Sequence, residues 1–139
     1  MTLAEELVDV LGEESVDSSP GTLERFRADE SVRSASDNTP SFIVTPRDAG
    51  RVNKVLQIAN KYRMPVVAVG YMSSTHGSSV PGKGSIVLDF KDWNEILEVD
   101  TKNRLVTVRP GVTIMQLQKE LEKMVSSLLT GRQPGLGQQ

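Results

Sequence analysis

The sequence has 139 residues, of which 37% are hydrophobic and 24% charged, so it is long enough for one domain with an apolar core. Its 16 basic and 18 acidic side chains leave a net charge of −2 without a basic cluster, which argues against a nucleic-acid partner. No apolar run approaches the roughly 20 residues of a membrane span, and the absence of cysteine excludes disulfides and thiolate chemistry; we expect a cytoplasmic protein.

Residues 1–39 are expected to form an N-terminal helix and a connection. Thr2 and Glu5 have the spacing of a capping box, and apolar side chains then recur at helical intervals until Gly12. A further helical turn is expected over residues 22–27. From residue 29 to residue 40 the chain is polar and aperiodic, which indicates an extended surface connection.

Residues 40–93 carry the pattern of a parallel βαβ unit, with strands over residues 41–44 and 66–69. Between these strands, Thr45 is predicted to cap a helix, Pro46 to occupy its first position and Asp48 to complete a capping box. The run 66–69 is continuously apolar, which is typical of a strand that is buried on both faces. A second run of this kind covers residues 86–88 and is followed by Asp89, which is expected to fix the next turn.

Residues 70–84 join the two apolar runs and carry the strongest functional signal. They are rich in glycine and serine and include the sole histidine, His76. Small residues let backbone N–H groups approach an anion and hydroxyls add donors, so the stretch predicts a cradle for a phosphate-bearing ligand; the alternative is a plain surface connection. Its spacing matches neither the dinucleotide fingerprint nor the P-loop. His76 is expected to hydrogen-bond to backbone or ligand rather than to act as a general base.

Residues 94–139 change to an antiparallel pattern. Strands over 96–100 and 104–108 flank a short polar turn and predict a hairpin. Thr113 and Gln116 predict a capping box for a helix with an apolar face. This face is formed by Ile114, Leu117 and Leu121. A lone hairpin is marginally stable in water, so the block looks incomplete, and its exposed face is expected to favour a homo-oligomer.

The ordered succession of these motifs resembles the N-terminal part of the FAD-binding domain of the vanillyl-alcohol oxidase and p-cresol methylhydroxylase (PCMH) family. The nearest branch is that of the glycolate oxidase and D-lactate dehydrogenase flavoproteins. The family's runs are a proline-flanked strand, a glycine-rich phosphate loop, a strand ending in L-D-L, an I-L-E-V-D strand, and P-G-V before a helix. Here they are PSFIVTP (40–46), GYMSSTHG (70–77), GSIVLDF (84–90), NEILEVD (94–100) and PGV (110–112).

The resemblance implies an α+β fold: a PCMH-type FAD-binding domain with a parallel first lobe over residues 40–93 and the start of an antiparallel second lobe over 94–139. The FAD pyrophosphate would lie on the backbone and hydroxyls of the phosphate loop, residues 70–84. The cofactor-binding residues implied are Pro46, Gly70, Tyr71, Met72, Ser73, Ser74, Thr75, His76, Gly77, Ser78 and Pro81. Met72 replaces the loop's second glycine, and it is expected to be strained if that position needs a positive φ.

Family members that bind flavin covalently place a histidine directly after the second glycine of the loop, where this chain has Ser73. Non-covalent FAD is therefore expected. The family oxidises small alcohols or 2-hydroxy acids by hydride transfer to the flavin, with domains beyond the matched part. We expect the N-terminal FAD-binding portion of such an oxidoreductase, without catalytic residues of its own and able to use a substrate only with the missing domains. The alternatives are a non-catalytic flavin- or phosphate-binding module, decayed or partner-dependent, and an unrelated nucleotide-binding module.

Overall fold

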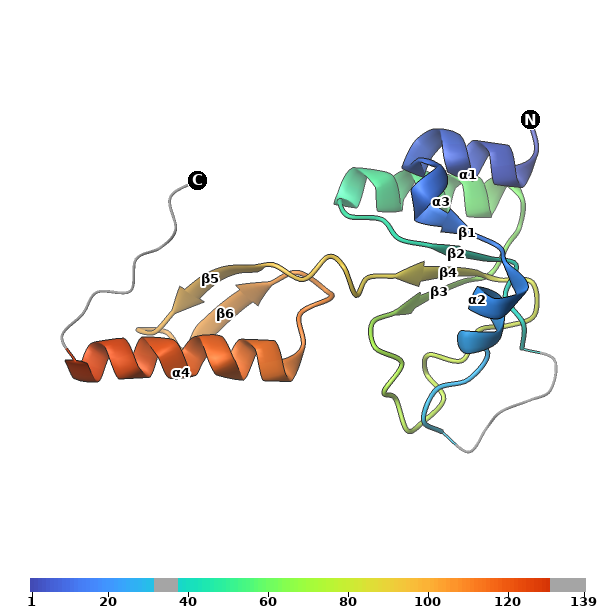
Figure 1. The fold of residues 1–139 in the computed structure, drawn as a ribbon. Helices are drawn as coiled ribbons and strands as arrows, with labels where there is room; N and C mark the ends of the chain where they lie inside the picture. Colours follow the sequence, from blue (N-terminus) through green and yellow to red (C-terminus); the bar gives the residue numbers. More distant parts are fainter. Residues whose placement is uncertain (32–37, 131–139) are drawn as a thin grey trace. The chain divides into compact units, whose positions relative to one another are not determined.

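The computed structural model describes residues 1–31 and 38–130, with side chains up to residue 125. The chain divides into two compact units, Met1–Trp93 and Asn94–Gln139. Figure 1 shows a four-stranded sheet with helices in the first unit, and a hairpin with a helix in the second. The α+β class is thereby confirmed. The predicted connection over 29–40 falls partly outside the described residues, at 32–37.

The sheet of the first unit is mixed, with strand order β1-β2-β4-β3. Its strands are β1 (Val16–Asp17), β2 (Phe42–Val44), β3 (Val66–Val69) and β4 (Ile86–Asp89). β4 is parallel to both β2 and β3, with Val87 opposite Ile43 on one side and Val67 on the other. The predicted βαβ strands are therefore parallel, but β4 lies between them. β1, antiparallel to β2, was not predicted because two residues carry no periodicity.

Burial differs between the two strands that flank the phosphate loop. All four residues of β4 are buried, as predicted for a central strand. In β3, however, only Val69 is buried and Ala68 is exposed. The prediction that both runs are buried on both faces is thus wrong for β3, because this strand lies at the edge of the sheet.

Helices cover both faces of the sheet (Figure 1). α1 (Leu3–Leu11) and α3 (Ala49–Lys61) lie on one face and α2 (Pro20–Arg25) on the other. Alternate residues of β4 point to opposite sides, so Ile86 and Leu88 pack with α1 and α3, whereas Val87 packs towards α2. The helical turn predicted over residues 22–27 is present but begins and ends two residues earlier, and its apolar side chains pack on the cluster around Val87.

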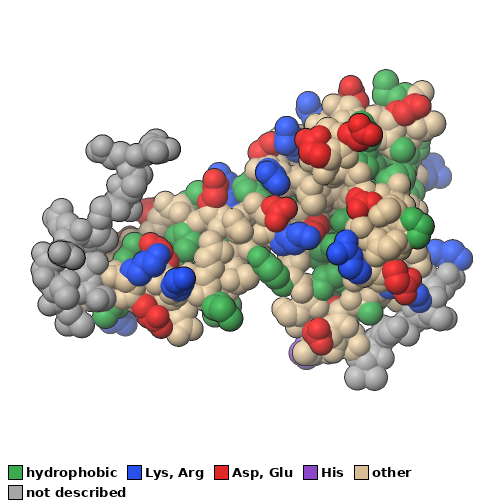
Figure 2. All heavy atoms as spheres, viewed as in Figure 1, with side chains coloured by type: hydrophobic (Ala, Val, Ile, Leu, Met, Phe, Trp, Pro, Cys, Tyr) green, Lys and Arg blue, Asp and Glu red, His purple; other side chains and the backbone are tan. Residues whose placement is uncertain are grey.

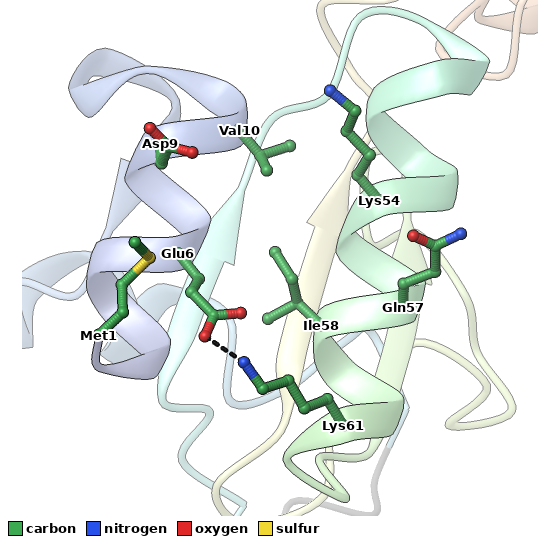
Figure 3. Close-up of a pocket in the computed structure, with 8 residues that line it drawn as sticks. All are labelled: Met1, Glu6, Asp9, Val10, Lys54, Gln57, Ile58 and Lys61. Carbon is green, nitrogen blue, oxygen red and sulfur yellow. Dashed lines mark hydrogen bonds and ion pairs between the residues drawn. The ribbon is translucent and has the colours of Figure 1, made fainter.

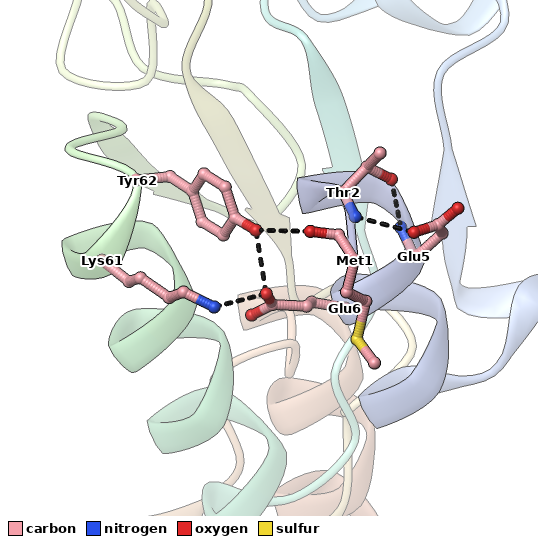
Figure 4. Close-up of polar contacts among 6 residues, drawn as sticks. All are labelled: Met1, Thr2, Glu5, Glu6, Lys61 and Tyr62. Atoms are coloured by element: carbon pink, nitrogen blue, oxygen red, sulfur yellow. Dashed lines mark hydrogen bonds and ion pairs between the residues drawn. The ribbon is translucent and has the colours of Figure 1, made fainter.

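α1 is held at its start and along its length by polar contacts (Figure 4). The predicted capping box is present: the Glu5 carboxylate accepts from the Thr2 N–H at 2.7 Å, and the Glu5 N–H donates to the Thr2 hydroxyl at 3.3 Å. Glu6 accepts from the ammonium group of Lys61 and from the Tyr62 hydroxyl, the latter at 2.8 Å. The hydrogen bond from Lys61 lowers the pKa of Glu6, so this carboxylate ties α1 to α3 at neutral pH.

α3 begins later than the sequence predicts. Its N-cap is Asp48, whose Oδ1 accepts from the Arg51 N–H at 2.8 Å. The Thr45 N–H donates instead to the carbonyl of Ser15 at 3.0 Å, next to the β1–β2 pairing, and Pro46 lies buried in the loop before the helix. The predicted roles of Thr45 as cap and Pro46 as first helical residue are therefore wrong, because a segment distant in sequence holds Thr45.

In the second unit, β5 (Ile96–Asp100) and β6 (Leu105–Val108) form the predicted antiparallel hairpin. The turn is one residue longer than predicted, since Arg104 has a left-handed backbone with φ of 57° and stands outside β6. Asp100 organises this turn by accepting from the Asn103 N–H at 3.0 Å. That hydrogen bond lowers the pKa of the Asp100 carboxyl.

α4 (Ile114–Thr130) follows the hairpin. Thr113 caps it as predicted, with its hydroxyl accepting from the Gln116 N–H at 3.0 Å. The Gln116 side chain, however, donates to the carbonyl of Asn94 at 2.8 Å, so the predicted reciprocal half of the capping box is replaced by a contact within the second unit. None of the helices searched, all within the described residues, meets the length and hydropathy needed to cross a membrane.

Candidate functional site

The phosphate loop leaves the carboxyl end of β3 and returns to the start of β4 (Figure 1). A pocket of about 250 Å³ lies at its beginning. The pocket is lined by loop residues 70–72, by Arg25 and Phe26 at the end of α2, and by Asp89 and Lys91 at the end of β4. Ligands of parallel α/β sheets collect outside the carboxyl ends of strands, so the position favours a binding role for the loop.

The backbone of the loop is left-handed at Met72 (φ 54°), Gly77 (φ 80°) and Gly84 (φ 71°). Glycine adopts such a conformation without penalty, whereas methionine does not. Gly70 and Gly82 have ordinary φ values, and a Cβ built on either would meet no atom within 4 Å. Glycine is therefore conformationally required at 77 and 84 but not at 70 and 82.

Met72 combines this strained backbone with a packed side chain. The side chain is half-buried and packs against the cluster formed by Ile43, Val69 and Val87, on which Phe26 also packs. Met72 stands where the family's loop has its second glycine, and its φ is positive. Strain at Met72 is expected if this position needs a positive φ. Part of that strain is offset by the apolar contacts of the side chain.

Hydroxyl groups organise the middle of the loop. The Ser74 Oγ accepts from the His76 N–H at 3.3 Å and from the Ser78 hydroxyl at 2.8 Å. The Val80 N–H donates to the Gly77 carbonyl at 3.3 Å and closes a turn. The loop is therefore ordered by its own polar groups rather than by apolar packing.

Several backbone donors in the first half of the loop are left without an acceptor. Within the described part of the chain, the N–H groups of residues 72–75, 77 and 78 donate to no protein atom. Backbone N–H groups of a folded protein normally find a partner in protein, water or ligand. A run of such donors around two left-handed residues is suited to an anion with several oxygens.

His76 is exposed and contacts its neighbour Thr75, with 3.1 Å between the Thr75 hydroxyl and the His76 Nδ1. No carboxylate contact orients its ring in the described structure. The ring contact is to a side-chain hydroxyl rather than to backbone or ligand, so the predicted role of His76 stays a prediction.

Asp89 and Lys91 form an ion pair at the end of β4. The buried Asp89 carboxylate accepts from the Lys91 N–H at 3.0 Å and from its ammonium group at 3.1 Å. Asp89 therefore fixes the turn after β4, as predicted. Lys91 and Arg25 bring two cationic groups to the pocket that sequence reasoning did not single out, because neither belongs to the loop.

Asp29 was also missed. Its Oδ2 accepts from the Ser79 N–H at 3.3 Å and its Oδ1 from the Ser31 N–H at 2.9 Å. It stands in an aperiodic polar stretch, so its local sequence gives no signal of a partner in the loop. The remaining predicted residues Pro46 and Pro81 are both fully buried and line none of this pocket.

A larger pocket, of about 530 Å³, lies between α1 and α3 (Figure 3). Its lining includes Glu6, Lys54, Ile58 and Lys61 and no loop residue. The ion pair between Glu6 and Lys61 crosses it, so the groups that face the groove are already partly paired. Of these two pockets we favour the smaller as the site, because its lining joins loop residues 70–72 to the end of β4. Figure 2 shows basic and acidic side chains interspersed on the visible face.

Comparison with known proteins identifies the family of this fold. The family profile described as "FAD binding domain" matches residues 40–136. The glycolate oxidase subunit GlcD of Bacillus subtilis is 31% identical over 118 residues, which cover 85% of this chain and 25% of that protein. The mitochondrial D-lactate dehydrogenase (cytochrome) of Arabidopsis thaliana is 29% identical over 86 residues, covering 62% of this chain and 15% of that protein. The chain thus spans a quarter or less of the length of these relatives.

Solved structures agree on the fold. p-Cresol methylhydroxylase with bound substrate superposes with a TM-score of 0.79 at 24% identity, covering 87% of this chain and 24% of that one. At this identity the superposition shows the fold and not the function. The predicted resemblance to PCMH-type FAD-binding domains is confirmed.

Proposed function

Because the chain belongs to the FAD binding domain family, we propose that residues 70–78 bind the pyrophosphate of FAD without a covalent bond. The observation that carries this proposal is the run of unpartnered backbone N–H groups around Met72 and Gly77. Arg25 adds positive charge at the same end of the sheet, where Lys91 is paired with Asp89. These donors and charges fit a diphosphate, which is the anionic part of FAD.

The pocket volume limits what the first unit holds by itself. At about 250 Å³ the pocket is smaller than those that usually enclose a drug-sized ligand, so it suits one end of a dinucleotide. When bound, FAD supplies the hydride acceptor, and the protein supplies position and electrostatics. We infer that the loop fixes the diphosphate while further parts of a longer protein enclose the flavin ring and the substrate.

The activity we propose for that longer protein is oxidation of a small 2-hydroxy acid or alcohol. Its support is the similarity to proteins named as a glycolate oxidase subunit, a D-lactate dehydrogenase and, in Stutzerimonas stutzeri, a D-2-hydroxyglutarate dehydrogenase at 31% identity over 83 residues. No residue of this chain is assigned a catalytic role. We also propose a cytoplasmic location, and self-association through the exposed face of the second unit. Of the predicted face, Ile114 is 80% exposed, whereas Leu117 and Leu121 are half-buried.

A second candidate function is a flavin-family module that binds the cofactor weakly or only with a partner. One observation favours it: a methionine at the left-handed loop position, where strain opposes the binding conformation. The two candidates differ in the affinity of the purified chain for FAD and in its absorbance between about 350 and 500 nm.

The test of pyrophosphate binding compares two glycines of the same loop. Gly77→Val places a β-branched side chain at a φ of 80°, whereas Gly82→Val places it at an ordinary φ with open space around it. We expect titration calorimetry with ADP and with FAD to show at least a tenfold loss of affinity for Gly77→Val and little change for Gly82→Val. Equal affinities of the two variants would remove Gly77 from the site.

A further inference from the structure

Asp29 is joined to the phosphate loop by a contact that spans 50 residues of sequence. Its carboxylate accepts from the Ser79 N–H at 3.3 Å, at the point where the loop turns back towards β4. Hydrogen bonds from Ser31, then from the Ser79 N–H and the Ser74 hydroxyl, lower the pKa of the Asp29 carboxyl. Asp29 is therefore ionised at neutral pH while it holds the loop.

A carboxylate beside a phosphate cradle has two opposite possible effects. It repels a bound diphosphate by Coulomb interaction, and it consumes donors that the ligand would otherwise use. It also fixes the backbone, which lowers the conformational cost of binding. The position of the contact separates these effects: Ser79 lies beyond the run of unpartnered N–H groups, which ends at Ser78.

We propose that Asp29 is a positioning residue of the phosphate loop, which anchors Ser79 and thereby presents the N–H groups of residues 72–75, 77 and 78 to the ligand. This proposal rests on the proposed function, since the ligand is taken to be the diphosphate of FAD. Within the loop, the Ser74 hydroxyl accepts from His76 and Ser78, and the Val80 N–H donates to the Gly77 carbonyl on the far side of Ser79. Fixing one end of this network restrains the segment that carries the free donors.

The chain offers a matched control in Asp17. Like Asp29, it accepts from the N–H group two residues further on, here Ser19 at 2.8 Å, and hydrogen bonding from that N–H lowers the pKa of its carboxyl. Asp17 makes no contact with the loop in the described structure. Asp17→Ala thus removes the same kind of local turn, and Asp29→Ala removes the turn together with the anchor.

The experiment measures ADP affinity, unfolding free energy and hydrogen exchange of the Ser79 amide in the full chain. For Asp29→Ala we expect about a tenfold loss of ADP affinity and at least tenfold faster exchange at Ser79, with Asp17→Ala changing neither. Asp29→Asn keeps an acceptor oxygen and loses the charge, so we expect it to restore affinity to within about threefold of the parent.

The outcomes separate this proposal from the proposed function. Tighter ADP binding by Asp29→Ala would show that the carboxylate competes with the ligand and would overturn the positioning role. Unchanged Ser79 exchange in Asp29→Ala would overturn the anchor, whether or not ADP binds. If the parent chain binds neither ADP nor FAD, the proposed function fails, while the exchange measurement still decides whether Asp29 holds the loop.

Discussion

Replacing Met72 by glycine and by alanine should reverse the usual order of stability of these two residues. At an ordinary strand or helix position, glycine is less stable than alanine by roughly 0.5–1 kcal/mol because it loses more backbone entropy on folding. Met72 has a φ of 54°, where a residue with a Cβ is strained by roughly 1–2 kcal/mol. The strain exceeds the entropy term, so we expect Met72→Gly to be more stable than Met72→Ala by up to about 1 kcal/mol.

Both variants also lose the packing of the Met72 side chain on the cluster around Val87. Full burial of a methionine contributes about 1.5–3 kcal/mol, so a half-buried one contributes about 1 kcal/mol. Met72→Ala should therefore be destabilised by about 1 kcal/mol, and Met72→Gly should stay within about 1 kcal/mol of the parent. Both variants lose the same side-chain packing, so the difference between their unfolding free energies reports the backbone contribution alone.

Urea unfolding followed by the fluorescence of Trp93, the sole tryptophan, measures this difference in the first unit, where Trp93 packs near Phe90. Met72→Gly should also bind ADP more tightly than the parent, because glycine adopts the left-handed conformation without strain. If Met72→Ala is as stable as Met72→Gly or more so, the backbone at 72 is not left-handed, and the account of Met72 as a strained substitute for glycine is refuted.

Three further predictions concern the core, the α1–α3 contact and the cofactor. Leu7→Ala, at a fully buried position, should lower the unfolding free energy by about 2–5 kcal/mol, whereas Leu56→Ala, at a side chain that is 45% exposed, should change it far less in the same urea titration. The hydrogen bond from Lys61 holds the pKa of Glu6 below its usual 4.5. The ionised carboxylate therefore stabilises the fold at neutral pH, and this stabilisation is lost as the pH falls through the folded-state pKa. Acid unfolding should show a smaller pH dependence in Glu6→Gln than in the parent. Acid precipitation of flavin-loaded protein should leave the flavin in the supernatant, and colour in the pellet would contradict non-covalent binding.

Elements with a strong local pattern could be predicted from the sequence. The capping box at Thr2, the hairpin of β5 and β6 and the buried strand β4 all follow from spacing or hydrophobic runs within a few residues. The start of α3 could not, because Thr45 and Asp48 are both good N-cap residues, and the choice depends on the contact of Thr45 with Ser15. A pattern of neighbours does not reveal such a contact.

In the candidate site, too, local sequence predicts some features and tertiary contacts determine the others. Glycine and serine content located the loop, but it did not distinguish Gly77, which needs its left-handed backbone, from Gly82, which does not. Asp29 and Lys91 were missed because their relation to the loop arises only when distant segments meet. Composition therefore predicts where a ligand cradle lies, whereas tertiary contacts decide which residues shape it.

The loop is supported from outside the residues that match the FAD binding domain profile. That match begins at residue 40, yet Phe26 packs on the same apolar cluster as Met72, and Asp29 accepts from Ser79. Phe26 thus shares an apolar cluster with Met72, where the segment with the free N–H groups begins, and Asp29 contacts Ser79, which directly follows that segment. Hydrogen bonds within the loop order its middle, and these external contacts support it at its two ends. We therefore propose that the segment after α2 belongs to the binding apparatus.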